Sequence, residues 1–185
     1  MKKLLGSLLC LAMVVGLTGC GDGGSDRADK TTLRTAKGGD IEVMDPAIVD
    51  DSVTANVLCQ MYEGLYKLDK DGNAVPNVAA ELPQISEDGL TYTIKLNEGI
   101  KWSDGQPLKA SDFVYAWKRA AAMGTGTAYY SQFINKIKNG GTGKALKSMD
   151  ELKDFGAVAK DDTTLVITLK QRCAYFTSLL TNTVF

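Results

Sequence analysis

Adjacent carboxylates are side chains that could serve acid–base chemistry, and examples in this sequence are Asp50-Asp51, Glu87-Asp88 and Asp161-Asp162. Neighbouring side chains point to opposite faces of a strand, or lie about 100° apart around a helix. Neither geometry sets two carboxylates facing each other across a substrate, as a hydrolytic pair requires. The last two pairs are better explained as turns, because strand-like runs follow both of them.

The sequence has 185 residues and no histidine. This excludes the Ser-His-Asp and Cys-His arrangements, and with them the histidine-bearing zinc sites and the commonest general base. A phosphate-binding loop of the form Gly-x-x-x-x-Gly-Lys-Ser/Thr is missing as well. A carboxylate-dependent hydrolase is the enzyme class that remains, and the sequence offers it no facing acid pair.

Cys20 stands at the end of an apolar segment that is typical of a targeting signal. Lys2 and Lys3 precede an apolar run from Leu4 to Leu17. The run is too short for a spanning helix of ~20 residues but sufficient for the ~7–15 residues of a secretory signal. Its end, Leu17-Thr18-Gly19-Cys20, resembles the lipobox of bacterial lipoproteins. The resemblance implies that residues 1–19 are a signal peptide and that Cys20 is the lipidated amino terminus of the mature protein.

Residues 20–32 are expected to be a flexible tether behind the lipid. Gly21–Thr32 contains no apolar side chain larger than Ala28, so the segment has nothing to bury. Because each buried methylene of an acyl chain contributes ~0.8 kcal/mol, lipid chains on Cys20 would hold the protein on a membrane without a spanning helix. We therefore expect a lipid-anchored protein on the extracytoplasmic face of the cell membrane.

The charge balance argues against a nucleic-acid partner. Of 21 basic side chains, Lys2 and Lys3 fall in the signal peptide, which leaves 19 against 22 acidic ones, a net charge of −3. No basic patch is evident in the sequence. Cys59 and Cys173 could be oxidised outside the cytoplasm, but their apolar, helix-like surroundings are more typical of small core residues.

Strands are predicted where apolar and polar residues alternate. The clearest case is Leu90–Leu96, which alternates as a half-buried antiparallel strand does. Its apolar face consists of Leu90, Tyr92, Ile94 and Leu96. Residues 100–102 follow a turn and are expected to return as the hairpin partner of this strand. Further strands are expected at 33–36, 66–68 and 164–170.

Two helices are predicted from caps and apolar spacing. One spans 53–65, with Asp51 or Ser52 as its N-cap. Its apolar stripe consists of Val53, Val57, Met61 and Leu65. A shorter helix over 149–155 is predicted because Ser148 and Glu151 have the spacing of a capping box.

A third predicted helix has Ser111 as its N-cap and Asp112 in its first turn, where a carboxylate suits the helix dipole. The face expected to meet the core consists of Phe113, Ala116, Trp117 and Ala120. Trp117 and Trp102 are both expected to be core residues rather than an aromatic stacking platform. The mixture of helices and strands indicates an α/β fold.

The block GLTYTIKLNEGIKWSDGQPLKASDFVYAWKR, residues 89–119, resembles the signature of family 5 extracellular solute-binding proteins, the peptide receptors of ABC importers. Upstream motifs in the family's order and spacing are found at 44–46, 62–66 and 76–82, and downstream ones at 161–169 and 174–180. The resemblance covers essentially all of residues 33–185. Within the family, it points to the oligopeptide-binding branch.

This resemblance implies the architecture of a type 2 periplasmic binding protein, with two lobes joined by a hinge and an extra small domain. Residues 33–62 would start the first lobe, and 63–185 would form most of the small domain. Members of the family are much longer than this chain. We therefore expect residues 33–185 to be the truncated N-terminal part of such a protein.

The implied function is capture of oligopeptides and their delivery to a membrane permease. Such a protein is a monomeric binder and not an enzyme, with no cofactor, no catalytic residues and no metal ligands. The resemblance maps ligand contacts onto Asp50, Asp51, Ser52 and Tyr129. Alternatives with the same fold are receptors for nickel, haem or sugar, a peptide sensor, or a surface adhesin.

Overall fold

The computed structural model describes residues 35–36, 38–41, 43–124 and 133–182. The chain divides into two units, residues 1–37 and 38–185, and all the elements below belong to the second. This unit has the mixed α/β fold that the sequence predicts. Residues 33 and 34 of the predicted first strand lie outside the described residues, and residues 35–36 form no strand.

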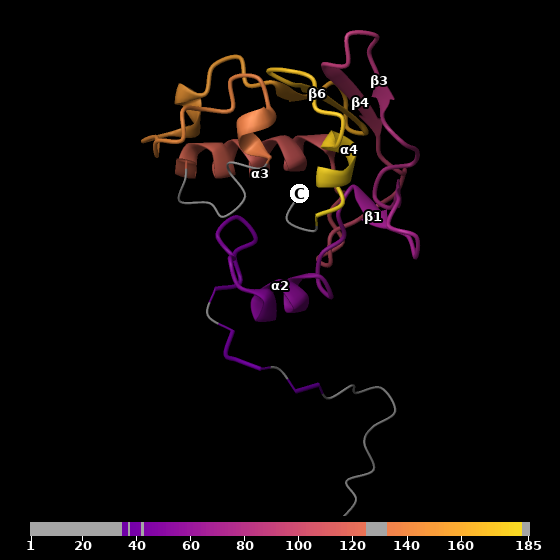
Figure 1. Cartoon of the computed structure of the whole chain (residues 1–185), viewed down its shortest axis with the longest axis vertical. Coiled ribbons are helices and arrows are strands. Elements are labelled where there is room, and N and C mark those ends of the chain that lie inside the picture. The colour runs from indigo at the N-terminus through magenta and orange to yellow at the C-terminus, as the bar shows by residue number, and fades with distance from the viewer. Residues whose placement is uncertain (1–34, 37, 42, 125–132, 183–185) are drawn as a thin grey trace, which may run out of the picture. The chain divides into compact units, whose positions relative to one another are not determined.

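A four-stranded antiparallel sheet is the framework of this unit (Figure 1). Its strands are β3 (Gln84–Ile85), β4 (Thr91–Lys95), β5 (Ala157–Ala159) and β6 (Thr164–Thr168), in the order β3-β4-β6-β5. The predicted alternation of β4 is confirmed, because Tyr92, Ile94 and Leu96 are buried. Ile94 lies opposite Leu165 of β6, so the buried side chains of the two strands lie on the same face of the sheet.

The predicted hairpin between β4 and residues 100–102 is wrong. Lys101 instead forms a bridge with Pro107, and the Trp102 N–H donates to the Gln106 carbonyl at 2.8 Å. A tight turn closes this local pair, with Gly105 at φ +87°. Glycine adopts that turn conformation without strain, so residues 101–107 pair with each other. Strand β4 pairs instead with β6, which lies about seventy residues later in the chain.

Helix α3 (Ala110–Met123) lies across one face of the sheet and contacts β5 and β6 (Figure 1). It begins after Lys109 and not at Ser111, and Asp112 in its first turn accepts the Lys109 backbone N–H at 3.0 Å. The residues buried on its core face are Ala110, Trp117, Ala120 and Ala121. Ala116, which was predicted to face the core, is exposed.

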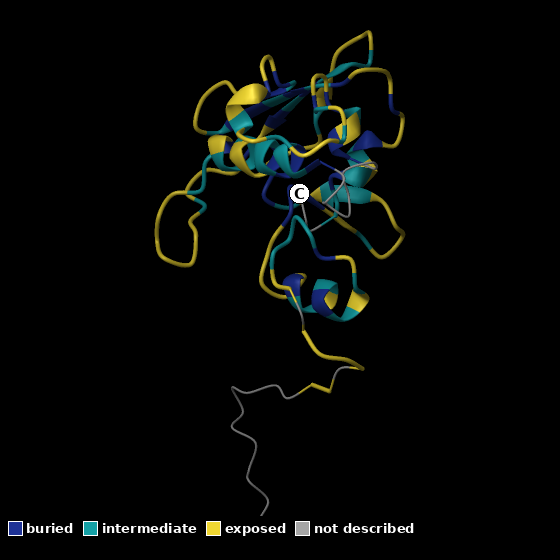
Figure 2. Ribbon diagram, turned by 90° about the vertical axis from the view of Figure 1, so that its left-hand side faces the viewer, coloured by how far each residue is buried: buried dark blue, intermediate teal, exposed yellow. Residues whose placement is uncertain are grey.

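The core between α3 and the sheet contains a chain of aromatic rings. The Trp117 and Phe133 rings meet edge to face at 5.2 Å between centroids, and Phe133 stacks on Phe176 at 5.5 Å. The Phe176 ring in turn meets Tyr92 of β4 at 4.9 Å. The prediction for Trp117 is confirmed, since it is 2% exposed, but Trp102 is 43% exposed and does not belong to this core. Figure 2 shows the burial of α3 and the sheet.

Helix α2 (Ser52–Leu58) is shorter than the predicted 53–65. Its Asp51 N-cap is confirmed, but the buried positions are Thr54 and Leu58 rather than the predicted stripe. After Leu58, the backbone tightens into bonds between residues three apart, such as the Met61 N–H to the Leu58 carbonyl at 2.9 Å, which is how many helices end. Met61 is consequently 62% exposed.

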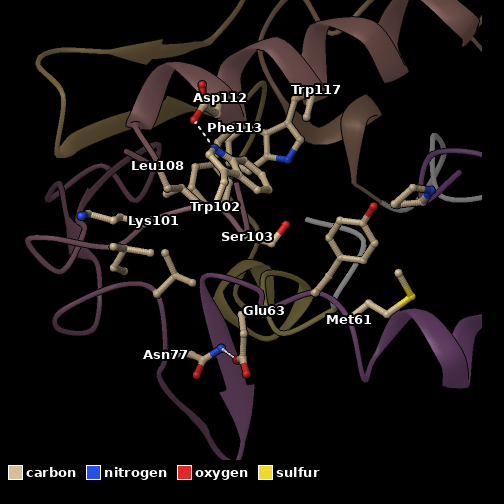
Figure 3. A pocket seen from close by; sticks show the side chains of 15 residues that line it. Met61, Glu63, Asn77, Lys101, Trp102, Ser103, Leu108, Asp112, Phe113 and Trp117 are labelled. Atoms are coloured by element: carbon tan, nitrogen blue, oxygen red, sulfur yellow. Dashed lines mark hydrogen bonds between the residues drawn. The ribbon is translucent and has the colours of Figure 1, made fainter. Parts of the chain in front are cut away.

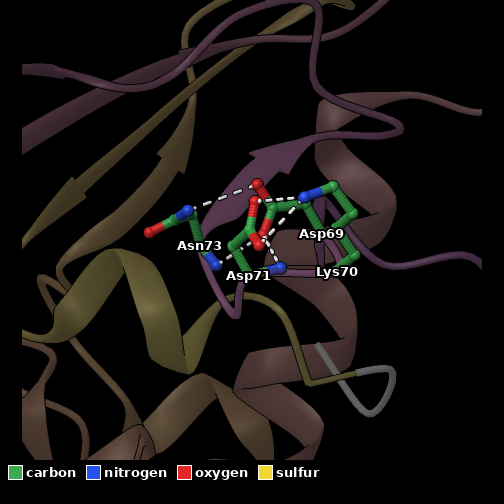
Figure 4. A network of polar contacts seen from close by, with 4 residues as sticks. All are labelled: Asp69, Lys70, Asp71 and Asn73. Carbon is green, nitrogen blue, oxygen red and sulfur yellow. Dashed lines mark hydrogen bonds and ion pairs between the residues drawn. The ribbon is translucent and has the colours of Figure 1, made fainter.

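Strands β1 (Tyr66–Leu68) and β2 (Ala74–Pro76) form a separate antiparallel hairpin. The Asp69 carboxylate closes its turn by accepting the backbone N–H groups of Asp71 and Asn73 at 2.9 and 2.8 Å (Figure 4). Lys70 forms an exposed ion pair with Asp71 at 2.9 Å. The strand at 66–68 was predicted, but its partner at 74–76 was not. The turn forms here because Asp side chains accept hydrogen bonds from nearby backbone N–H groups.

The remaining elements are short. They are the 3₁₀ helices η3 (Ile134–Lys136) and η4 (Met149–Glu151) and the helix α4 (Phe176–Leu179). The predicted capping box between Ser148 and Glu151 is present, but it starts a single 3₁₀ turn instead of a helix over 149–155. Cys173 is buried as predicted, Cys59 is exposed, and no disulfide joins them.

Candidate functional site

An open cavity of about 640 Å³ lies beside the exposed part of α3 (Figure 3). Four stretches of the chain, together with residues 112–117 of the helix, enclose it. Its lining residues are Pro46, Met61, Tyr62, Glu63, Asn77, Val78, Ile100, Lys101, Trp102, Ser103, Leu108, Asp112, Phe113, Ala116 and Trp117. The volume lies within the range of ~300–1,000 Å³ that ligand pockets occupy, and aromatic side chains make up much of the wall.

Trp102 is held in place on one wall by Asp112. The indole Nε1–H donates to Asp112 Oδ2 at 3.0 Å, and the same oxygen accepts the Lys109 backbone N–H at 3.0 Å (Figure 3). One carboxylate oxygen therefore caps α3 and orients the tryptophan. The apolar face of the Trp102 indole remains partly in contact with solvent, and its polar atom is satisfied.

The opposite edge of the cavity carries a second polar pair. The Asn77 side-chain amide donates to the Glu63 carboxylate and, at 3.0 Å, to the Gly64 carbonyl (Figure 3). These contacts fasten the loop before β1 to the segment after β2. Met61 and Tyr62, which precede Glu63, contribute to the lining from the same loop.

Asp45 and Arg119 form an ion pair next to Pro46 of the cavity lining. Arg119 Nη1 donates to Asp45 Oδ1 at 3.1 Å, and Nη2 donates to the other carboxylate oxygen, so the pair is bidentate. The hydrogen bond from the Arg119 side chain holds the pKa of Asp45 below its ordinary value of 3.8. The pair ties the loop at residue 45 to the last turns of α3.

The predicted ligand contacts lie outside this cavity. Asp51 Oδ1 accepts the Thr54 N–H at 2.7 Å as the cap of α2, and that hydrogen bond lowers the pKa of the Asp51 carboxyl. Asp50 and Ser52 are exposed on either side of it. The three residues are adjacent, but none of them lines the cavity. Tyr129 and Cys20 lie outside the described residues.

The cavity includes residues that sequence reasoning assigned elsewhere. Trp102 and Met61 were expected in the core, and the pairing of Asp45 with Arg119 was not predicted. The exposure of Trp102 could have been suspected from the sequence, because Ser103, Asp104 and Gly105 directly after it are typical of a turn at the surface.

Within the described ranges, no three histidine, cysteine, aspartate or glutamate side chains come together in a way that could hold a metal ion. Among the same residues, no helix is both long and apolar enough to cross a membrane.

The family is established by a match of residues 73–185 to the model described as "Bacterial extracellular solute-binding proteins, family 5 Middle". The match covers more than half of the chain, and the chain therefore belongs to this family, as the resemblance at residues 89–119 implied. The description is that of a family of solute-binding proteins.

Two curated relatives align with nearly the whole chain. The dipeptide-binding protein of Lactococcus lactis subsp. cremoris is 32% identical over 183 residues, which are 96% of this chain and 32% of that protein. The oligopeptide-binding protein OppA of Bacillus subtilis is 35% identical over 179 residues, or 95% of this chain and 32% of OppA. The chain thus spans about a third of the length of these relatives.

A solved structure supports the same fold. Listeria monocytogenes OppA bound to peptide is 43% identical, with a TM-score of 0.67, over 77% of this chain and 28% of that protein. At this identity, the likeness extends beyond the fold to the sequence.

Proposed function

We propose that this chain is part of the lipid-anchored substrate-binding component of an ABC importer, which captures oligopeptides and delivers them to a membrane permease. The likeness to the peptide-bound Listeria monocytogenes OppA, at 43% identity over 77% of the chain, carries this proposal. Relatives named for dipeptide and oligopeptide binding support it. The protein would act as a monomer and without a cofactor.

In this proposal, residues 1–19 are the signal peptide, and residues 20–32 are the tether behind a lipidated Cys20. Residues 33–185 are the N-terminal part of a longer two-lobed receptor, with 33–62 at the start of the first lobe and 63–185 in the extra small domain. The chain spans about a third of the length of its relatives, which supports its being part of a longer protein. The protein would lie on the extracytoplasmic face of the cell membrane.

Peptide capture of this kind needs binding chemistry and no catalysis. The main chain of a peptide presents the same donors and acceptors whatever its sequence, so a cleft that pairs with the main chain accepts many peptides. Water-filled pockets can then accommodate different side chains. Closure of two lobes about a hinge would bury the ligand and change the surface that a permease contacts.

The ligand contacts in this proposal are Asp50, Asp51, Ser52 and Tyr129. The Asp51 carboxylate already accepts the Thr54 N–H, so its second oxygen is the one that could meet a ligand. Asp50 and Ser52, on either side of Asp51, are exposed. These contacts would supply one edge of a cleft whose other walls come from the rest of the receptor.

The test is isothermal titration calorimetry of the full-length gene product against a pool of tri- to pentapeptides. The Tyr129→Phe variant should bind many peptides more weakly by similar amounts, about 0.5–1.5 kcal/mol for one neutral hydrogen bond. A loss confined to one peptide sequence would contradict main-chain recognition by Tyr129. Failure of the unchanged full-length protein to bind any peptide would contradict the proposed function itself.

A further inference from the structure

Asn139 and Gly140 form the one Asn-Gly dipeptide in this sequence. An asparagine followed by glycine is especially prone to deamidation, because glycine has no side chain to hinder attack of its backbone nitrogen on the preceding amide. Asn139 is exposed, so water reaches its side chain. The turn after η3 therefore carries a chemically labile pair at the surface of the folded unit.

The fold favours this labile dipeptide at this turn. Asn139 has a φ of +55°, in the left-handed region that asparagine tolerates better than most residues with a side chain. Gly140 is buried, and a Cβ at this position would collide with the Ile134 carbonyl oxygen. Exchange of either residue would therefore strain the turn, so a more stable dipeptide does not fit here.

Both groups that would react are held by hydrogen bonds in the folded unit. The Asn139 Nδ2–H donates to the Asp154 carbonyl at 2.9 Å, and the Gly140 backbone N–H donates to the Ile137 carbonyl at 3.0 Å. Deamidation requires the Gly140 nitrogen to lose its proton, which breaks the bond to Ile137. It also requires the Asn139 side chain to turn toward that nitrogen and away from Asp154. The closed turn therefore opposes the reaction that its own sequence favours.

The turn is joined to the end of the sheet through Lys138. The Lys138 N–H donates to the Thr168 carbonyl at 2.8 Å, and the Lys138 carbonyl accepts the Gly156 N–H at 2.7 Å. Ile137, directly before Lys138, is buried and forms a bridge with Leu169. Opening of the turn should therefore be coupled to loosening of the segments on either side of β5 and β6.

We infer that Asn139 is a conditional deamidation site, which is protected while the turn after η3 is closed and is modified when the turn opens. In the open turn, the Gly140 nitrogen forms a bond to Asn139 Cγ, and the bond from Cγ to Nδ2 breaks. The Gly140 proton leaves with Nδ2 as ammonia, and the product is a cyclic imide. Water then opens this imide at either carbonyl and gives aspartate or isoaspartate, with no oxidation or reduction.

The modification prevents the turn from closing as before. A carboxylate at position 139 accepts hydrogen bonds but cannot donate one, so it loses the contact with the Asp154 carbonyl. Isoaspartate also lengthens the backbone next to Gly140, which has no space to adjust. Each opening that leads to reaction is therefore recorded permanently. This chemistry does not depend on peptide binding.

The experiment measures deamidation in the full-length gene product, expressed from residue 21. Folded protein and protein unfolded in urea are incubated in the same mildly alkaline buffer. The mass gain at Asn139 is followed by mass spectrometry of proteolytic peptides prepared at acidic pH, where the reaction is slow. Asn139→Asp controls the assignment, because this variant cannot gain the mass at position 139.

Asn139 should deamidate about a hundred-fold more slowly in the folded protein than in urea, since the reaction requires a locally open state. Rates that agree within about threefold would show that the closed turn gives no protection and would overturn the inference. Absence of deamidation at Asn139 in urea would overturn it as well, because the dipeptide would then not be labile.

Gly156→Ala tests the coupling between opening and reaction. A Cβ at position 156 would lie 2.8 Å from the Lys138 carbonyl oxygen, so this variant should speed deamidation at Asn139 in the folded protein about tenfold. Gly38→Ala is the matched control, since a Cβ there meets nothing within 4 Å, and its rate should equal that of the parent protein. If Gly156→Ala fails to fold, the parent protein in urea below its unfolding transition provides the same comparison, with a rate that rises with urea. No acceleration in the comparison made would overturn the inference.

Discussion

The ion pair between Asp45 and Arg119 joins side chains 74 positions apart and fixes the loop before α2 against α3. The Arg119 side chain is 40% exposed and that of Asp45 27%, so solvent screens much of their attraction. The bidentate geometry nevertheless places both carboxylate oxygens against one guanidinium, which is the stronger form of such a contact.

Arg119→Gln is expected to lower the free energy of unfolding by about 1 kcal/mol at pH 7, the upper end for a partly exposed pair. The pKa of Asp45 is lowered in the folded state relative to 3.8, so its contribution is present above pH 3.8 and is lost as the pH falls through the folded value. Urea denaturation of both proteins from pH 7 to pH 3 should therefore show the difference shrinking once the pH falls below about 4, as it approaches the lowered pKa of Asp45.

The control for this prediction is Lys109→Gln. It removes the pair with Asp162, whose side chains are 44% and 73% exposed, and should change the unfolding free energy by less than about 0.5 kcal/mol. An Arg119→Gln difference that stays constant down to pH 3 would show that Asp45 is not its partner.

A second prediction for a single residue concerns the lipidation of Cys20. If it is the lipidated amino terminus, Cys20→Ala should leave a protein that is not labelled by radioactive palmitate and that is released from membranes. Cys59→Ala is the matched control, because residue 59 lies on the folded unit, and its variant should be labelled like the parent protein. Undiminished labelling of Cys20→Ala would contradict the proposed anchor.

At the scale of the elements, Gly156 joins β5, β6 and the segment after η3. Its N–H donates to the Lys138 carbonyl at 2.7 Å, and its carbonyl accepts from Thr168 at 2.6 Å. The sequence predicted a helix stop here, but the structure shows a residue with no room for a side chain. A Cβ at this position would lie 2.6 Å from the Thr168 carbonyl oxygen, which is itself held by the Lys138 N–H.

Gly156→Ala is therefore expected to lower the free energy of unfolding by about 1–3 kcal/mol, the usual cost of forcing an added carbon into a packed site. Gly38→Ala is the matched control, since a Cβ there meets nothing within 4 Å, and it should change the free energy by less than about 0.5 kcal/mol. Both values can be measured by urea denaturation. Equal effects of the two variants would show that the backbone at 156 moves to make room.

At the scale of the whole molecule, residues 20–185 alone are expected not to bind peptides with micromolar affinity. A micromolar complex requires about −8.2 kcal/mol. One open wall leaves most main-chain groups of the peptide in water, while ordering each long side chain still costs roughly 0.5–1.5 kcal/mol. The proposed mechanism needs a second wall of the binding cleft, which the rest of the full-length protein would supply.

Calorimetry should compare residues 20–185 with the full-length gene product against the same tri- to pentapeptide pool. Binding is expected only for the full-length protein and not for residues 20–185. Comparable micromolar binding by residues 20–185 would show that capture does not need enclosure between two lobes, and this view of the mechanism would then be wrong.

Much of the local structure follows from sequence alone. The alternation at 90–96 predicted the buried face of β4, the run at 164–170 predicted β6, and a strand was predicted at 66–68, where β1 lies. These features depend on residues a few positions apart, and their periodicity reports which face is buried. The resemblance of residues 89–119 to a known family signature indicated the family, and the match of residues 73–185 to the family model confirms it.

Only the tertiary structure decided which partners these elements take. Periodicity shows that β4 has a buried face, but its pairing with β6 depends on contacts between distant residues, and the local turn after Trp102 removed the nearer partner. The same holds for Trp102, which is apolar and strand-like by sequence yet exposed at a cavity, and for the contact of Asp45 with Arg119. Burial and long-range pairing are properties of the packed chain, because each depends on what the rest of the fold places next to a residue.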